Sequence, residues 1–355
     1  MKKISLILIT FLLITGVSGS YGYFVYIYDN DNSSSEDAIV SDEIVEEEQS
    51  ETSQNQTASN ETEEPEEEKL PFDVVGIFKC IEIDSEQRCW QTHEPSQSIS
   101  DFPVPLVVDL HGYGFNSTEH RRISDFDEVT SDENAVVIYP DALDFSWNSG
   151  WCCGASKDQE RDDIGFILEM IDIAIDFHNI DDSRIYATGW SNGCAMAQAL
   201  ANKASDVFAS VGCMSWYLLQ EADNSYSPIP IIELHGILDL VIPYASDVNG
   251  GLAHGQVPTS ETASGAIQNM YNWKEMNGCN GNFPDVNEQN TFYSIQGFND
   301  CENNAQVRLV TLHAHGHNPY SEDAQQESTG TFLPGSQVPI STSQIAWDFI
   351  SQHTK

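Results

Sequence analysis

The fold of this chain is most clearly indicated by residues 184–193, RIYATGWSNG, and by the run of small residues that follows. Residues 184–188 are rich in strand-forming types and predict a buried strand, whereas residues 194–204 have helical composition. The sequence between them matches G-x-S-x-G, a tight turn from strand to helix that holds a serine hydroxyl clear of the sheet. Its glycines let strand and helix approach closely. The pattern predicts Ser191 as a nucleophile.

An acid follows the serine in the chain order that this arrangement requires. The apolar run of residues 229–234 predicts a strand, and Asp239 lies in the segment beyond it, HGILDLVIPY. A loop past a strand end can direct a carboxylate toward an imidazole, so we expect Asp239 to be the acid.

The base is expected in residues 313–319, HAHGHNP, directly after the alternating strand pattern of residues 307–312. A catalytic imidazole needs a loop position from which it can reach the serine, because the pleat fixes the side chains of a strand. This favours His317, with His315 as the alternative. If the strand continued, alternation would place His313 and His315 on one side of it, where a hydrogen-bonded structural role is expected.

These three residue types form a known chemical unit. A serine hydroxyl is a poor nucleophile at neutral pH and needs an imidazole to take its proton, while a carboxylate orients and stabilises that imidazole. The oxyanion that forms needs preorganised donors. One is expected from the backbone N–H of Asn192, and the second from Tyr113 in the turn His111–Gly114, which follows the apolar strand PLVVDL of residues 105–110.

The chain resembles the secreted esterases that group polyhydroxybutyrate depolymerases with feruloyl and acetylxylan esterases of carbohydrate esterase family 1. The resemblance implies an α/β-hydrolase fold, with a mostly parallel central sheet, helices on both faces and a single catalytic domain. It implies a Ser-His-Asp triad at Ser191, His317 and Asp239 without a cofactor. The chain lacks the tryptophan that the family usually shows before the proline after its histidine. The resemblance is carried by PLVVDLHGYG (105–114), WNSGWCCG (147–154), DDIGFIL (162–168), residues 184–193, residues 235–244 and residues 316–319.

The order of the other predicted elements agrees with this fold. Strands are expected at residues 135–139 and 207–214, and helices at residues 164–175 and about 260–276. A last helix is expected after a capping box formed by Ser341 and Gln344.

The composition restricts the class of partner. The net charge is −42 over 355 residues, and residues 29–69 alone carry 16 acids and one lysine. Nucleic acid is an implausible partner because its binding depends on clustered Lys and Arg. An acidic surface favours a soluble monomer.

The N-terminus predicts export. Lys2 and Lys3 precede the uncharged apolar segment of residues 4–28, which is either a cleaved signal peptide or an anchor in the membrane. Residues 29–69 are too polar to form a core and are expected to be a disordered acidic linker. Both readings place the catalytic domain, residues 70–355, outside the cell.

Eight cysteines fit an exported protein. Proximity suggests the pairs Cys80–Cys89 and Cys279–Cys301, although sequence alone does not fix the connectivity. No C-x-x-C pair occurs and no histidine has a ligand-like spacing from the cysteines, so no metal site is expected.

The substrate is the least determined feature. Trp147, Trp151 and Trp190 are placed at the active-site end of the sheet, where they either contact an aromatic acyl group, a sugar or a polyester, or pack locally. Hydrolysis of carboxylic esters is the expected activity. A serine peptidase of the same fold and a non-enzymatic surface adhesion domain are the alternatives.

Overall fold

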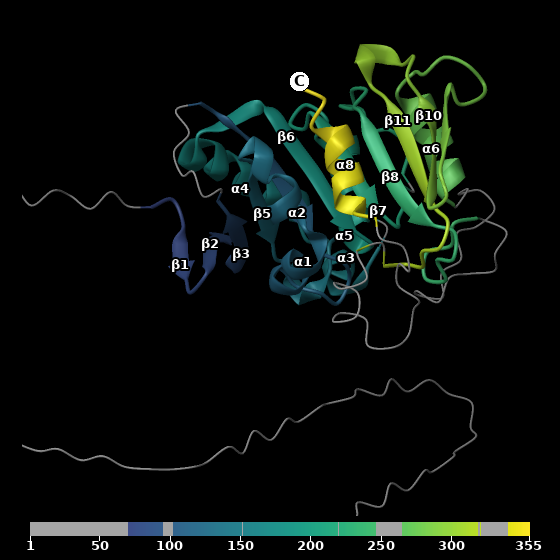
Figure 1. The fold of residues 1–355 in the computed structure, drawn as a ribbon. Coiled ribbons are helices and arrows are strands. Elements are labelled where there is room, and N and C mark those ends of the chain that lie inside the picture. Colours follow the sequence, from purple (N-terminus) through teal and green to yellow (C-terminus); the bar gives the residue numbers. More distant parts are fainter. Residues whose placement is uncertain are drawn as a thin grey trace, which may run out of the picture. The chain divides into compact units, whose positions relative to one another are not determined.

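A computed structural model describes residues 70–94, 102–150, 152–218, 220–245, 265–318, 320 and 340–355. These residues all belong to one compact unit, Glu67–Lys355 (Figure 1). The predicted export segment, the acidic linker and Trp151 lie outside the described residues. Within them, no helix has both the length and the apolar character needed to cross a bilayer.

The strands have the following bounds: β1 Asp73–Val75, β2 Phe78–Ile83, β3 Glu86–His93, β4 Val104–Leu110, β5 Val136–Pro140, β6 Ile180–Trp190, β7 Ser210–Met214, β8 Ile231–Gly236, β9 Val286–Gln289, β10 Tyr293–Phe298 and β11 Val307–Leu312. The helices are α1 Ser117–Ser124, α2 Phe126–Val129, α3 Gly154–Asp158, α4 Asp163–His178, α5 Asn192–Lys203, α6 Ala266–Met276 and α8 Thr342–Ile350, with short 3-10 turns η1 Ser131–Glu133, η2 Leu143–Phe145 and η3 Glu302–Asn304.

The strands form one sheet in the order β1-β2-β3-β5-β4-β6-β7-β8-β11-β10-β9. Strands β5, β4, β6, β7, β8 and β11 are parallel to one another. Antiparallel strands extend the sheet at both edges, β1 to β3 on one side and β10 with β9 on the other. The strand that leads to Ser191, β6, therefore lies inside the parallel part of the sheet.

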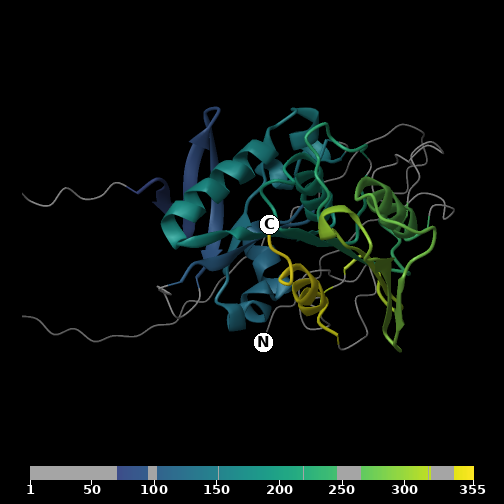
Figure 2. The same ribbon diagram turned by 90° about the horizontal axis from the view of Figure 1, so that it is seen from above.

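The sheet is covered on both faces. Alternate side chains of β4 point to opposite sides: Leu106 and Leu110 belong to the core that includes α4, α5 and α6, whereas Val107 belongs to the core that includes α1, α2 and α8. Figure 2 shows these two groups of helices on either side of the sheet. All seven residues of β4 are buried, as a parallel strand covered on both faces requires.

Local signals explain where the helices begin and end. The side chain of Asp162 accepts the N–H of Gly165 at the start of α4, and Asn179 ends that helix in the left-handed conformation. At α8 the hydroxyl of Ser341 accepts the N–H of Gln344. The expected capping box is only half present, because the Gln344 side chain bonds Asp348 instead of reaching back.

This architecture is the α/β-hydrolase fold, and it confirms the expected fold class. The bounds expected for β11 are confirmed, whereas β7 begins at Ser210 and not at Val207. β11 ends at Leu312, so His313 and His315 lie beyond the strand. The hydrogen-bonded structural role expected for His315 is not borne out, because neither ring nitrogen has a hydrogen-bond partner among the described residues. The disulfides Cys80–Cys89 and Cys279–Cys301 are confirmed.

Candidate active site

Ser191 occupies the sharp turn between β6 and α5. Its backbone has φ 56° and ψ −122°, a region that is costly for a residue with a side chain. Its N–H donates to the Met214 carbonyl at 2.9 Å, which fixes the turn against the end of β7. A Cβ on Gly193 would lie 2.0 Å from the carbonyl oxygen of Leu110, so glycine is required where the turn packs on β4. The turn predicted from sequence is thus built by close backbone packing.

His317 bridges the serine and the acid. Its Nε2 lies 2.8 Å from Ser191 Oγ, and its Nδ1 lies 2.8 Å from Asp239 Oδ2. A carboxylate can only accept, so Nδ1 carries a proton and Nε2 is left to accept the serine hydroxyl. The three residues follow β6, β8 and β11, whose carboxyl ends meet at one edge of the sheet because the strands are parallel.

Every acceptor position of Asp239 is used. Its Oδ1 accepts the N–H groups of Val241 and Ile242, both at 2.8 Å, and its Oδ2 faces His317. Burial alone would raise the pKa of Asp239, but the charges and hydrogen bonds of His317 and His235 hold it well below its usual range. The group is therefore a fixed, ionised carboxylate.

The two expected oxyanion residues lie at the start of α5 and in the turn after β4. Asn192 is the first residue of α5, so its N–H has no partner within the helix. Its side chain is engaged elsewhere, because Oδ1 accepts the N–H of Trp147 at 2.7 Å and Nδ2 donates to the Trp147 carbonyl. Tyr113 lies in the turn after β4 with its side chain 46% exposed. Gly114, with φ 79°, donates its N–H to Phe145.

His111 holds the Tyr113 turn in place. Its Nε2 accepts the N–H of Ala142 at 3.0 Å, so the proton is on Nδ1, which donates to the Gly112 carbonyl at 2.8 Å. The indole N–H of Trp147 donates to the His111 carbonyl. Burial lowers the pKa of His111 to about 3, against the opposing hydrogen bond to Gly112. A neutral imidazole with both nitrogens engaged is a structural part of this turn.

Residues 93–250 match the family model described as Esterase PHB depolymerase. This range includes Ser191, Asp239 and both expected oxyanion residues. Over residues 93–250 the chain is similar to this esterase family.

Relatives that the chain matches are named feruloyl and acetylxylan esterases. The chain is 27% identical to Feruloyl esterase B of Piromyces equi over 232 residues, which is 63% of this chain and 41% of that protein. It is 22% identical over 250 residues to the bifunctional acetylxylan esterase/xylanase XynS20E of Neocallimastix patriciarum, 70% of this chain and 31% of that protein. The match thus covers less than half the length of either relative. A solved acetyl xylan esterase from Aspergillus awamori, 15% identical, gives a TM-score of 0.48 and covers 67% of this chain and 92% of its own.

The tryptophans that the structure describes are buried. Trp147 is fully buried and its ring centroid lies 5.0 Å from that of His111. Trp190 is 5% exposed, and its indole N–H donates to the His317 carbonyl at 2.7 Å. Its ring packs edge-on against Phe115. Local packing therefore accounts for both side chains, and the substrate contacts of Trp190 and Trp151 stay predictions.

The ring of His315, the alternative base, makes no hydrogen bond to Ser191 or Asp239. Its ring is buried, and neither ring nitrogen has a partner among the described residues. Burial lowers the pKa of His315 to about 4. Its backbone carbonyl accepts the N–H of Leu238, which ties the base loop to the acid loop. Of the two histidines, His317 is the one that contacts both Ser191 and Asp239.

Two disulfides that sequence did not predict flank the site. Cys152–Cys153 joins neighbouring residues in the loop before α3, and the Asn192 amide contacts Cys153 Sγ at 3.8 Å. Cys194–Cys213 connects the first turn of α5 to β7. The Gln198 amide lies 3.4 Å from both of these sulfurs. Cys194–Cys213 therefore ties the start of α5, next to Ser191 and Asn192, to β7.

Sequence reasoning also missed Glu233 and His235 of β8. His235 Nδ1 lies 2.6 Å from Glu233 Oε1, and His235 Nε2 lies 3.3 Å from Asp239 Oδ2. Both side chains are buried. The available signal was a Glu and a His two positions apart, hence on one face of a strand that is otherwise apolar and ends just before the acid.

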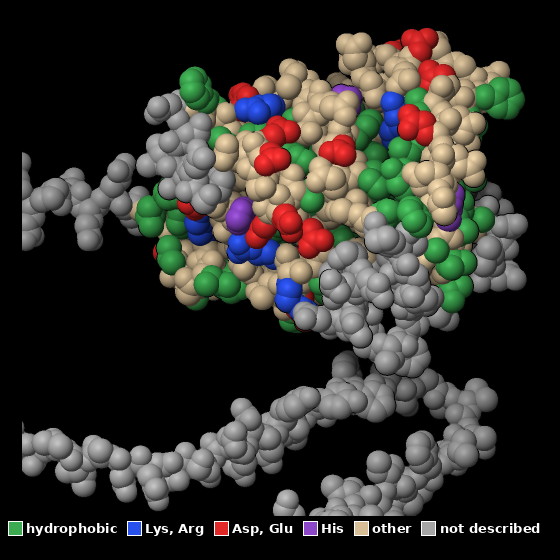
Figure 3. Space-filling view, viewed as in Figure 1, with side chains coloured by type: hydrophobic (Ala, Val, Ile, Leu, Met, Phe, Trp, Pro, Cys, Tyr) green, Lys and Arg blue, Asp and Glu red, His purple; other side chains and the backbone are tan. Residues whose placement is uncertain are grey.

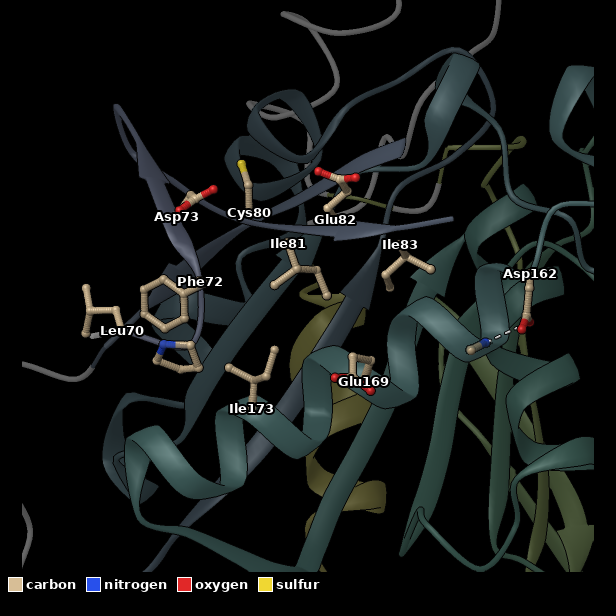
Figure 4. A pocket seen from close by; sticks show the side chains of 12 residues that line it. Leu70, Phe72, Asp73, Cys80, Ile81, Glu82, Ile83, Asp162, Glu169 and Ile173 are labelled. Carbon is tan, nitrogen blue, oxygen red and sulfur yellow. Dashed lines mark hydrogen bonds between the residues drawn. The ribbon is translucent and has the colours of Figure 1, made fainter. Parts of the chain in front are cut away.

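Two hollows lie apart from the triad. One, of about 620 Å³, lies between β2 and α4 and is lined in part by Asp73, Glu82, Asp162 and Glu169, as Figure 4 shows. The other, of about 590 Å³, is lined in part by carboxylates of α2, η1 and α8 on the face shown in Figure 3. Within the described part of the chain, no group of three His, Cys, Asp or Glu side chains is arranged to hold a metal ion.

Proposed function

We propose that this chain is an exported serine hydrolase of carboxylic esters that works through an acyl-enzyme on Ser191. The observation that carries the proposal is the hydrogen-bonded path from Ser191 Oγ through His317 to Asp239. The esterase family of residues 93–250 and the feruloyl and acetylxylan esterase names of the relatives support an ester as the substrate.

Acylation begins when an ester carbonyl carbon comes within reach of Ser191 Oγ. The oxygen attacks that carbon as His317 Nε2 takes the hydroxyl proton, and Asp239 stabilises the imidazolium that forms. The carbonyl electron pair moves to the oxygen, which accepts the N–H groups of Asn192 and Tyr113. The C–O bond to the alcohol then breaks, and the alcohol leaves with the proton from His317.

Deacylation repeats these steps with water. His317 Nε2 removes a proton from the water, whose oxygen attacks the acyl carbon bound to Ser191. The second tetrahedral intermediate uses the same two N–H donors. Its collapse breaks the bond to Ser191 Oγ, returns the proton to the serine and releases a carboxylic acid. No cofactor takes part in this cycle.

The acyl group is proposed to be acetyl or feruloyl, ester-linked to a hydroxyl group of a sugar. Apolar side chains of the acid loop and the oxyanion turn are exposed beside the triad, and such surface suits an apolar acyl group better than a charged one. These side chains are Ile237 (44%), Leu238 (48%), Leu240 (53%) and Tyr113 (46%).

Action outside the cell is part of the proposal. The cysteines of the described residues are all paired in four disulfides, which form and persist in oxidising compartments. Residues 4–28 are the proposed export segment, cleaved or retained as an anchor, and residues 29–69 the acidic linker.

The test is a substrate panel with the full chain. Methyl ferulate, acetylated xylan, hydroxybutyrate oligomers, p-nitrophenyl acetate and an unstructured peptide are incubated with wild type and Ser191→Ala. The proposal expects hydrolysis of the feruloyl or acetyl ester by wild type alone. Cleavage of the peptide without any ester turnover would favour the peptidase, and no turnover of any substrate would favour the adhesion domain.

A further inference from the structure

A second buried histidine lies behind the acid of the triad. His235 is the fifth residue of β8 and is fully buried, as is nearly all of Glu233 two residues before it. Its Nδ1 lies 2.6 Å from Glu233 Oε1. Its Nε2 lies 2.8 Å from the Ile242 carbonyl oxygen and 3.3 Å from Asp239 Oδ2. Polar contacts therefore continue from Ser191 past Asp239, through His235, to Glu233.

The partners of the His235 ring determine its protonation. Carboxylate and carbonyl oxygens are acceptors only, and a neutral imidazole has a single N–H. With acceptors at both nitrogens, one short contact would be left without a proton unless both nitrogens carry one. We infer that His235 is an imidazolium at neutral pH and a positioning residue, which orients Asp239 and balances the Glu233 charge behind the triad.

The other groups around the ring agree with a positive charge. Tyr217 stacks on His235 at 6.1 Å between ring centroids, and Tyr244 meets it edge-on at 5.8 Å. Tyr244 Oη is engaged with the Thr311 hydroxyl. Burial alone would lower the pKa of His235, but Glu233 and Asp239 outweigh it and raise the pKa to about 10. The hydrogen-bond, ion-pair and ring contacts of His235 within the described residues involve no Lys or Arg.

The charges of His235 and Glu233 should affect protonation of His317. This consequence rests on the proposed function, in which His317 is the base. The positive charge of His235 opposes protonation of His317, because both rings contact the same oxygen, Asp239 Oδ2. The negative charge of Glu233 has the opposite effect. Removing either member alone should therefore move the acid limb of the pH profile for ester hydrolysis in opposite directions.

The test measures kcat/KM for p-nitrophenyl acetate from pH 4 to 10 with the full chain. His235→Gln keeps a hydrogen-bond donor but loses the charge, so the acid limb of its profile should move about one unit higher. Glu233→Gln should move the limb about one unit lower. The double variant should return it near the wild-type position. His353→Gln, at the other end of the domain, serves as the control.

A purely structural role predicts a different outcome. Loss of packing would lower kcat/KM in both single variants with the acid limb unmoved or moved in the same direction, and either result would overturn the inference. Failure of the proposed function is recognised separately, because wild type would then hydrolyse no ester and Ser191→Ala would change nothing.

A second measurement needs no stable variant. Long-range ¹H–¹⁵N spectra of ¹⁵N-histidine-labelled wild type are recorded at pH 8.5. One ring should still show two protonated nitrogens. If every histidine ring is neutral at that pH, His235 is not an imidazolium and the inference is wrong.

Discussion

Trp190 donates its indole N–H to the backbone carbonyl of His317 at 2.7 Å, although the two residues are 127 positions apart. Trp190 directly precedes the serine, and its ring centroid lies 5.5 Å from that of His317. Trp190, next to Ser191, thus holds the loop that carries His317. This link couples the position of Ser191 to that of His317 without any contribution from their own side chains.

Trp190→Phe should weaken this coupling while keeping an aromatic ring. One buried hydrogen bond contributes about 1 kcal/mol net, and tenfold in rate corresponds to about 1.4 kcal/mol. We expect kcat/KM for p-nitrophenyl acetate to fall about tenfold with a small change in melting temperature. Trp347→Phe, at a buried position of α8, is the matched control. Equal kcat/KM in wild type and Trp190→Phe would show that the hydrogen bond does not position the base.

Substitution of the two buried histidines, His315 and His317, should have different effects on ester hydrolysis. His317→Ala removes the proton acceptor of Ser191, and loss of a triad member typically costs about 10⁴-fold or more in kcat. His315→Ala leaves the triad bonded and should cost less than about tenfold, with a lower melting temperature from the lost packing. Ester hydrolysis by both variants gives the comparison. If His315→Ala suffered the larger loss of kcat, the assignment of the base would be wrong.

The Cys194–Cys213 disulfide should support activity as well as stability. Its cysteines are 19 positions apart, close to the 22 of Cys279–Cys301. Replacing either pair by alanines should therefore cost a similar free energy of unfolding, about 3 kcal/mol. Activity well below the unfolding temperature should fall only for the Cys194 and Cys213 pair, because Cys194 lies in the first turn of α5. Equal activity in both double variants would contradict this.

The stability of the fold should decline at alkaline pH because His235 loses its proton there. Its pKa is raised in the folded protein to about 10, from about 6.5 when unfolded. The folded state therefore binds its proton more tightly, and the resulting stabilisation is complete below about pH 6.5 and is lost as pH rises through about 10. Urea unfolding at pH 6, 8 and 10 should show a decline of a few kcal/mol in wild type that His235→Gln lacks. If the free energy of unfolding declined equally in wild type and His235→Gln, His235 would not be the source of the decline.

The parallel part of the sheet could be predicted from sequence because its signals are local. Residues 307–312 alternate and are flanked by polar turns, and they form β11 with those bounds. The turn at Ser191 is marked by Gly189 and Gly193, whose lack of a side chain is needed where the backbones meet. These residue types are required by contacts that the motif itself implies.

The edges of the sheet could not be predicted in this way. β1 is three residues long with every residue exposed, and β9 is polar and largely exposed, so neither carries the apolar pattern of a buried strand. Only their pairing with a neighbour makes them strands. The link between Glu233, His235 and Asp239 was missed for a related reason, since it depends on how the loop after β8 folds back over the strand.

Labelling of the full chain with a fluorophosphonate probe, followed by peptide mass spectrometry, tests whether Ser191 is the nucleophile. The probe reacts with a serine only when a neighbouring base activates it. We expect one modified peptide in wild type, with the label on Ser191, and no label in Ser191→Ala. An unlabelled wild type, or equal labelling of Ser191→Ala, would contradict the catalytic role of the serine at the end of β6.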